Sequence, residues 1–77
     1  MADTTQIREH MEVVGSDGQH VGTVDKLEGP RIKLTRKDPA AGGAHHYVDA
    51  SLVEGVGAQV RLSQPAEQVR QGWQAAG

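Results

Sequence analysis

Residues 13–27 read VVGSDGQHVGTVDKL, and this stretch decides the fold because its residues predict a β-hairpin. Asp17 and Gly18 separate two runs that are rich in valine. Asp-Gly is among the strongest short-range hairpin signals, since both residues tolerate the positive φ of a tight turn. The sequence therefore predicts two antiparallel strands, over residues 11–14 and 20–27, on either side of this turn.

The second strand of the hairpin carries a break in its hydrophobic period. Val21, Val24 and Leu27 are three residues apart, whereas side chains on one face of a regular strand recur every two residues. Gly22 accounts for the break, because a glycine inside a strand often marks a bulge that resets the phase and bends the strand. Bent strands of this kind close small barrels, so the hairpin predicts a barrel-like sheet.

Outside the hairpin, alternation and turn residues predict three more strands and two short helical turns, namely strands 31–35, 44–49 and 59–63 and turns 3–10 and 50–53. Near the C-terminus the spacing of apolar residues changes from the period of a strand to that of a helix. Pro65 suits a first helical turn, and Ala66, Val69 and Trp73 recur at helical spacing, which predicts a short amphipathic helix over residues 64–75. We expect Trp73 to pack on its own barrel, and the alternative is dimerisation or partner binding through this helix or an open sheet edge.

Length and composition set the fold class. A chain of 77 residues forms one domain with little stability to spare, and without Phe its core has to be built from Val, Leu, Ile and Met. Because β-branched residues favour pleated sheet, we predict a mostly β protein. The predicted fold is a small, bent, antiparallel β-barrel or half-barrel of about five strands with a short N-terminal helical turn and the C-terminal helix. Residues 1–6 are predicted to be a flexible N-terminus and residues 7–77 a single domain.

Several kinds of chemistry are excluded by what the chain lacks. Without cysteine there is no disulfide, no thiolate nucleophile and no cysteine-ligated zinc. No stretch approaches the roughly 18 apolar residues of a membrane span, and the first residues lack both a basic segment and an apolar run. We expect a cytoplasmic protein without membrane contact or cofactor. We also expect no enzymatic activity, because no arrangement of Ser, His and Asp is recognisable.

The histidines raise the question of a metal site. If residues 44–49 form a strand, His45 and His46 point to opposite faces and cannot share one ion. A metal would need His45 together with Asp49, or with His20 from another strand. Because histidines without a fixed-spacing motif are weak evidence for a ligand set, we interpret them as structural or solvated residues.

A second candidate surface is basic. Five of the eight Lys and Arg residues fall within twelve positions, namely Lys26, Arg31, Lys33, Arg36 and Lys37. In a hairpin, Lys26, Arg31 and Lys33 line one outer face, which would contact RNA phosphates in a strongly salt-dependent way. Single-stranded RNA recognition usually needs aromatic stacking platforms, however, and the strands offer only Tyr47. With a net charge of −2, the chain favours a solvated outer face over nucleic-acid binding.

Three segments carry a family resemblance, namely residues 13–25, residues 32–39, which read IKLTRKDP, and residues 42–48, followed by Trp73. They resemble a family of small bacterial proteins of unknown function that are similar to PRC-barrel domains, named for the photosynthetic reaction centre subunit that contains one. The resemblance extends from Ile7 to Trp73. Relatives include a domain of ribosome maturation factors, so the resemblance implies protein contacts, and it implies no catalytic residues.

The long loop near residues 36–43 is where we expect function, because long loops on tight scaffolds often carry binding residues. We predict a non-catalytic interaction module that contacts an unidentified protein or a second copy of itself, as a homodimer. Its predicted contact surface consists of Arg36, Lys37, Asp38, His45, His46, Tyr47 and Trp73. The alternative is an accessory protein that binds RNA or a metal.

Overall fold

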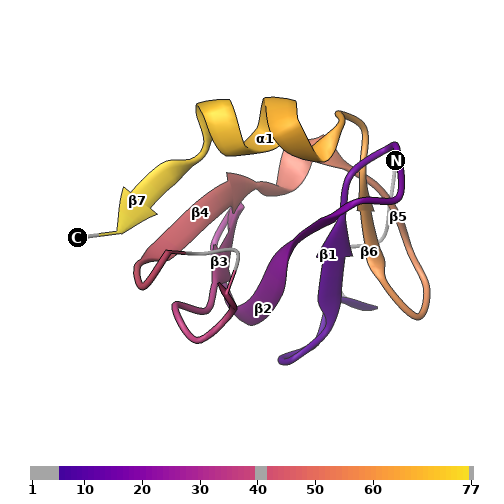
Figure 1. The fold of residues 1–77 in the computed structure, drawn as a ribbon. Helices are drawn as coiled ribbons and strands as arrows, with labels where there is room; N and C mark the ends of the chain where they lie inside the picture. The colour runs from indigo at the N-terminus through magenta and orange to yellow at the C-terminus, as the bar shows by residue number, and fades with distance from the viewer. Residues whose placement is uncertain (1–5, 40–41, 77) are drawn as a thin grey trace.

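The computed structural model describes residues 6–39 and 42–76. Within them it contains seven strands, one α-helix and a short 3-10 helix, arranged around a valine-rich core (Figure 1). In chain order the elements are β1 (Glu12–Val14), β2 (His20–Glu28), β3 (Arg31–Leu34), β4 (His45–Asp49), η3 (Ala50–Leu52), β5 (Val53–Val56), β6 (Val60–Leu62), α1 (Ala66–Gly72) and β7 (Gln74–Ala76). None of the helices in these residues is long and apolar enough to cross a membrane.

The strands form one mixed sheet in the order β5-β6-β1-β2-β3-β4-β7. Neighbouring strands are antiparallel except β1 and β6, which run parallel with Val13 opposite Val60. β5 and β7 are the two edges, so the sheet is not closed into a barrel. The mostly β class and the C-terminal helix are confirmed. Of the predicted barrel or half-barrel, the closed barrel is wrong, and so is the number of about five strands. The parallel pair of β1 and β6 is an exception to the predicted antiparallel sheet. Strand periodicity does not reveal direction or closure, because both depend on which segments pack together.

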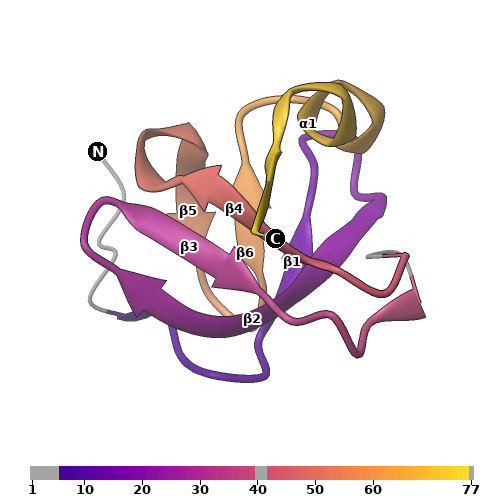
Figure 2. The ribbon, with the colours of Figure 1, turned by 90° about the vertical axis from the view of Figure 1, so that its left-hand side faces the viewer.

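β2 belongs to both halves of the sheet, and it curves between them (Figure 2). Its first part pairs with β1 and its second part with β3, and each pairing leaves one extra residue on β2. The extra residue is Val21 against β1 and Asp25 against β3. The bulge predicted from Gly22 is therefore present next to this glycine, and a second bulge follows. A Cβ on Gly22 would lie 3.0 Å from Cδ1 of Leu34, so the glycine also lets β3 approach closely.

The hairpin turn lies at Asp17 and Gly18 as predicted, but of the two only Gly18 has a positive φ, of 78°. Asp17 contributes its side chain instead. Its Oδ1 accepts hydrogen bonds from the backbone N–H of Gln19 at 3.2 Å and of Ala66, the first residue of α1, at 3.4 Å. Gly15 allows this close approach, because a Cβ there would overlap the backbone nitrogen of Ala66. The hairpin tip is therefore attached to the start of the helix.

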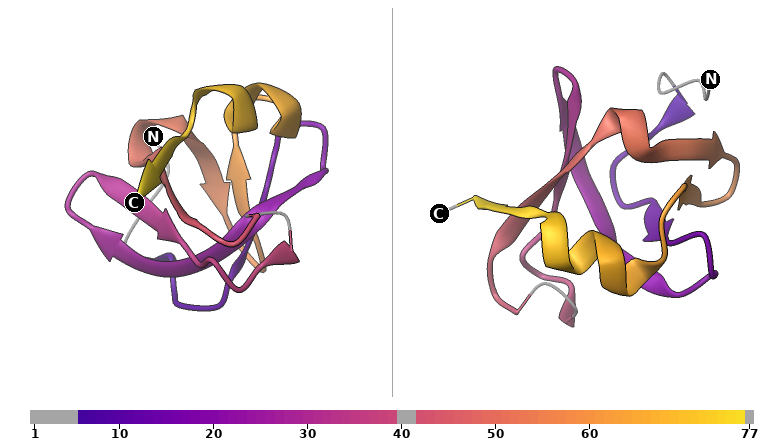
Figure 3. Two further views of the ribbon diagram at one scale, coloured as in Figure 1. Left: turned by 60° about the vertical axis from the view of Figure 1, so that its left-hand side comes forward. Right: turned by 90° about the horizontal axis from the view of Figure 1, so that it is seen from above.

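The core lies between the concave side of the sheet and one face of α1 (Figure 3). Alternation along β3 is regular, with Ile32 and Leu34 buried and Arg31 exposed. Leu27 lies opposite Ile32, on the same face as Val24 because of the second bulge, and it is 37% exposed near the end of β2. The core cluster consists of Ile7, Val13, Val21, Val24, Ile32, Leu34, Val48, Val53, Val60, Leu62, Ala66 and Val69.

Both ends of the chain differ from the sequence prediction. α1 ends at Gly72, as expected for a residue of low helix propensity, and the chain continues as β7 beside β4. The edge strands β5 and β7 were not predicted, because neither shows the alternation of a half-buried strand. Of the predicted flexible segment 1–6 and helical turn 3–10, residues 1–5 lie outside the described residues. Residues 7–10 are not helical and end in His10 with a φ of 68°.

We predict that Gly15→Ala lowers the free energy of unfolding by about 2–3 kcal/mol, because the new Cβ meets backbone that cannot rotate away. Its nearest neighbours would be the backbone nitrogen of Ala66 and, at 2.9 Å, the carbonyl carbon of Pro65. Gly57→Ala is the matched control, since no atom lies within 4 Å of that Cβ. Urea denaturation of both variants measures the difference. Equal midpoints would mean that the hairpin tip does not pack on the helix.

Candidate functional site

β4 sends its residues to two faces of the sheet. His46 and Val48 are buried on the concave face, whereas Tyr47 is half-exposed and Asp49 exposed on the outer face. Asp49 also begins η3, because its Oδ1 accepts a hydrogen bond from the backbone N–H of Ser51 at 2.9 Å. This hydrogen bond lowers the pKa of Asp49, so the carboxylate stays charged over a wider pH range.

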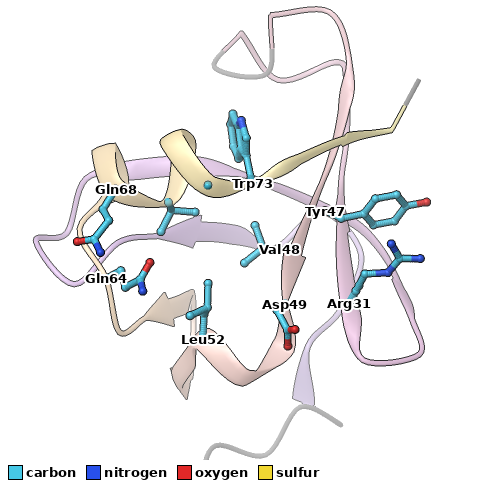
Figure 4. A pocket seen from close by; sticks show the side chains of 10 residues that line it. Arg31, Tyr47, Val48, Asp49, Leu52, Gln64, Gln68 and Trp73 are labelled. Carbon is cyan, nitrogen blue, oxygen red and sulfur yellow. The ribbon is translucent and has the colours of Figure 1, made fainter.

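A groove of about 260 Å³ lies between β4, η3 and α1, and we call it the helix groove (Figure 4). Its apolar floor consists of Val48, Leu52, Val69 and Trp73, beside Gly72. Its polar rim consists of Arg31, Tyr47, Asp49, Gln64 and Gln68. β7 pairs with β4 only from His45 to Tyr47. Among the described strands, none pairs with Val48 and Asp49 on this side. The helix groove thus lies along an uncovered part of a strand edge.

Trp73 lines the helix groove and packs on the core at the same time. Its ring stacks on the imidazole of His46, with the ring centroids 4.0 Å apart and the planes 15° apart. His46 is 9% exposed, and within the described residues its Nδ1 has no hydrogen-bond partner. The backbone N–H of Trp73 donates to the carbonyl of Val69 at 2.8 Å, which ends α1. Trp73 therefore packs on its own domain, as expected from the sequence.

The outer face of β2, β3 and β4 carries the predicted nucleic-acid residues. Lys26 lies opposite Lys33, and Arg31 follows on the same face of β3, so the three do share a surface. Two of them already have partners: Lys26 lies 3.1 Å from Glu28, and the guanidinium of Arg31 lies 4.4 Å from the ring centroid of Tyr47. The Tyr47 hydroxyl donates to Glu28 at 2.7 Å, which lowers the pKa of Glu28 and raises the pKa of Tyr47.

A group of polar residues that we call the histidine clamp connects three distant segments. His20, at the start of β2, places Nδ1 2.8 Å from Oε2 of Glu12 on β1 and Nε2 2.7 Å from Oδ2 of Asp38 in the loop after β3. The hydroxyl of Thr23 donates to the same Asp38 oxygen at 2.7 Å. The amide of Gln59 donates to Glu12 at 2.6 Å. The side chain of Asp38 is 4% exposed, whereas that of Glu12 is 42% exposed.

The clamp shifts two pKa values. Burial opposes a charge on His20, but hydrogen bonds to Glu12 and Asp38 outweigh burial and raise the pKa of His20 above its ordinary value of 6.5. The hydrogen bonds from His20 and Gln59 lower the pKa of Glu12 below 4.5. The network therefore favours a charged histidine between two charged carboxylates.

A second, more open pocket of about 600 Å³ lies beside the clamp, and we call it the loop pocket. Its polar lining consists of His10, Thr23, Asp25, Thr35, Arg36, Lys37, Asp38 and His45. His45 has a fixed ring, since its Nδ1 donates to the carbonyl of Leu34 at 3.1 Å. Two exposed cations, Arg36 and Lys37, dominate the rim of this pocket.

The structure does not bring the predicted contact residues onto one surface. Arg36, Lys37 and His45 line the loop pocket, whereas Tyr47 and Trp73 line the helix groove. The remaining two, Asp38 and His46, are buried at 8% and 9% exposure, and Asp38 also lines the loop pocket. Asp38 is drawn inward by its hydrogen bonds, and His46 points to the concave face because it follows the alternation of β4.

The three residues considered for a metal do not meet. His45 and Asp49 lie at opposite ends of β4, and both ring nitrogens of His20 bond to carboxylates. Across residues 6–39 and 42–76, no group of three or more His, Cys, Asp or Glu residues is placed to hold a metal ion.

Residues 7–70 match a family model described as an uncharacterized protein conserved in bacteria, DUF2171. The chain belongs to the DUF2171 family. No curated protein matches the chain, and no solved structure does. The matched DUF2171 region contains the whole histidine clamp and all of the helix groove except Gly72 and Trp73.

Several site residues of this DUF2171 protein escaped sequence analysis. Leu52, Gln64 and Gln68 form the helix groove only because η3 and α1 are brought next to β4. Glu12 joins the clamp through the hairpin register, which places it opposite Thr23. That register follows from the turn at residues 17–18 only together with the bulge next to Gly22, because without the extra residue Glu12 would lie opposite Gly22.

We predict that Trp73→Ala lowers the free energy of unfolding by about 2–3 kcal/mol, below the full value for a buried Trp because the ring is partly exposed. The substitution removes the indole ring, and with it the stack on His46 and the packing against the core. Leu27→Ala serves as the control, with an expected change within about 0.5 kcal/mol at this exposed position. Urea denaturation measures both. An unchanged midpoint for Trp73→Ala would show that Trp73 does not hold α1 on the sheet.

Proposed function

We propose that this DUF2171 protein is a non-catalytic interaction module whose helix groove binds an extended segment of a partner protein. The observation that carries the proposal is the uncovered edge of β4 at Val48 and Asp49, beside an apolar floor that includes Leu52 and Trp73. An open strand edge accepts an extended chain through backbone hydrogen bonds, and pockets beside the edge accept its side chains.

The size and chemistry of the helix groove favour one anchoring side chain over a small-molecule cofactor. A volume of about 260 Å³ lies below the roughly 300–1,000 Å³ of most small-molecule sites. An aliphatic or aromatic side chain of the partner would cover the apolar floor, and interface anchors of this kind often pack against Trp. Gln64 and Gln68 present amides that both donate and accept, which suits the backbone of an extended segment.

The state of the histidines supports a role without catalysis. Both ring nitrogens of His20 bond to carboxylates, Nδ1 of His45 donates to a backbone carbonyl, and His46 lies behind Trp73. A general base needs a ring nitrogen within reach of a substrate proton, which His20 and His46 do not offer. We place this function in the cytoplasm as part of the same proposal, a location that suits a chain without cysteine.

We also propose that the chain is related to PRC-barrel domains. The support is the hairpin sequence of residues 13–25, together with the bend that Gly22 allows in β2. The resemblance implies protein contacts, which agrees with a groove for a partner segment. The open sheet is a departure from a closed barrel, and it leaves β5 and β7 as edges.

The proposal predicts that short peptides selected from a random displayed library bind the helix groove through a large apolar residue. Leu52→Lys should weaken the binding of the selected peptides at least about tenfold, because a charged side chain in the apolar floor must be desolvated. Fluorescence of Trp73, the only Trp of the chain, measures the dissociation constants.

Leu27→Lys provides the matched control, because it makes the same change at an exposed position of β2 outside the helix groove. Its affinity for the peptides should equal that of the unmodified protein. Gln68→Arg, on the exposed rim, serves as a second groove variant if Leu52→Lys does not fold. Failure to select any peptide, or equal affinity in groove and control variants, would refute the proposal.

A second candidate function is RNA binding through the outer face, supported by the shared surface of Lys26, Arg31 and Lys33. It ranks below the first because Lys26 is paired with Glu28 and Arg31 is stacked on Tyr47. A binding assay with mixed RNA at low salt distinguishes RNA binding from the binding of a partner segment. Salt-sensitive binding that disappears in the Arg31→Ala, Lys33→Ala double variant would support this candidate.

A further inference from the structure

The two hydrogen bonds of His20 determine its protonation state. Its Nδ1 and Nε2 each lie within 2.8 Å of a carboxylate oxygen, on Glu12 and Asp38 respectively. An ionised carboxylate only accepts hydrogen bonds, whereas a neutral imidazole has only one N–H to donate. With both carboxylates ionised, the two bonds form together only when His20 carries protons on both nitrogens. The geometry is therefore that of a positively charged imidazolium shared between two anions.

The two carboxylates differ in what they lose when the proton leaves. The Asp38 side chain is 4% exposed and the Glu12 side chain 42% exposed. Burying a carboxylate without hydrogen bonds is far less favourable than exposing it to water. A neutral His20 therefore keeps its single N–H on Nε2 for Asp38 and gives up Glu12. Asp38 also loses the attraction of the positive charge, so its loop is held less tightly.

We propose that the histidine clamp is a proton-operated device that fastens the loop after β3 to the β1-β2 hairpin. When His20 is protonated, Glu12, His20 and Asp38 form one chain of charged hydrogen bonds between these segments. When it is neutral, the bond to Glu12 breaks and the loop opens more often. This loop carries Arg36 and Lys37 at the rim of the loop pocket, so the proton controls how firmly these two cations are presented.

Charged groups on β1, on α1 and in the loop after β3 contact His20. Glu12 on β1 and Asp38 in the loop favour the imidazolium. Arg70 on α1 donates to the backbone carbonyl of His20, and its positive charge works in the opposite direction. Gln59 is neutral and holds the second oxygen of Glu12. The carboxylates outweigh burial and raise the pKa of His20, which agrees with the geometry.

The direction of the pH effect follows from these shifts. Because the pKa of His20 is raised from 6.5 on folding, its stabilising effect is complete below that value and is lost as pH rises through the folded pKa. Because the pKa of Glu12 is lowered from 4.5, its stabilising effect is present above that value and is lost as pH falls through the folded pKa. The clamp is therefore strongest between these two ordinary values.

Nuclear magnetic resonance of the histidine ring nitrogens tests the proposal directly. We expect both nitrogens of His20 to be protonated at about pH 5.5, with titration above the ordinary histidine range. Glu12→Gln and Asp38→Asn should each lower the pKa of His20, whereas His45→Gln should leave it unchanged. His45 is the matched control because its ring bonds to a backbone carbonyl and takes no part in the clamp.

Hydrogen exchange measures the effect on the loop. After correction for intrinsic exchange, the amides of residues 35–38 should open about twofold to fivefold more often above the pKa of His20 than below it, since a partly exposed ion pair contributes modestly. His20→Gln should remove this pH dependence. If Asp38→Asn does not fold, Glu12→Gln, at an exposed carboxylate, provides the same comparison. A His20 that titrates at or below the ordinary value, or a loop that opens equally at both pH values, would overturn the proposal.

Discussion

β2 pairs with β1 before its bend and with β3 after it, and this one strand holds the two halves of the sheet together. The two bulges increase its local twist, so that short strands curve around a core instead of lying flat. Gly22 makes room for Leu34 on the concave side of this bend. Val21 and Val24 both become buried although they are three residues apart, because a bulge resets the alternation.

The bend leaves the sheet open at one end, and α1 covers that end. The helix begins against the hairpin tip, where Asp17 accepts a hydrogen bond from Ala66, and it ends at Trp73, which stacks on His46 of β4. It is thus held at both ends by contacts that involve the hairpin and the fourth strand. The helix groove is a consequence of this arrangement, since α1 crosses above Val48 without filling the space beside it.

The two candidate sites differ in how they arise. The helix groove depends on the packing of a helix against a strand edge, and its floor shares residues with the core or packs against it. The histidine clamp depends on charge, and it joins residues that are 8 and 18 positions away from His20 in the chain. A partner segment and a proton would therefore act on separate parts of the molecule.

The sequence by itself determined the local structure. Asp17 and Gly18 specify the turn, Gly22 specifies the bulge, and the alternation around Ile32 specifies β3, because each of these signals acts between near neighbours in the chain. It determined less about the ends, where β7 becomes a strand only because β4 offers an edge.

Only the tertiary structure decided the parallel pairing of β1 with β6, the open sheet and the membership of both candidate sites. Asp38 shows why. Its sequence position marks it as a polar loop residue, yet it lies buried because His20 and Thr23 supply the hydrogen bonds that a buried carboxylate requires. Those donors come from a different strand, and no local pattern in the chain encodes a contact between segments that meet only after folding.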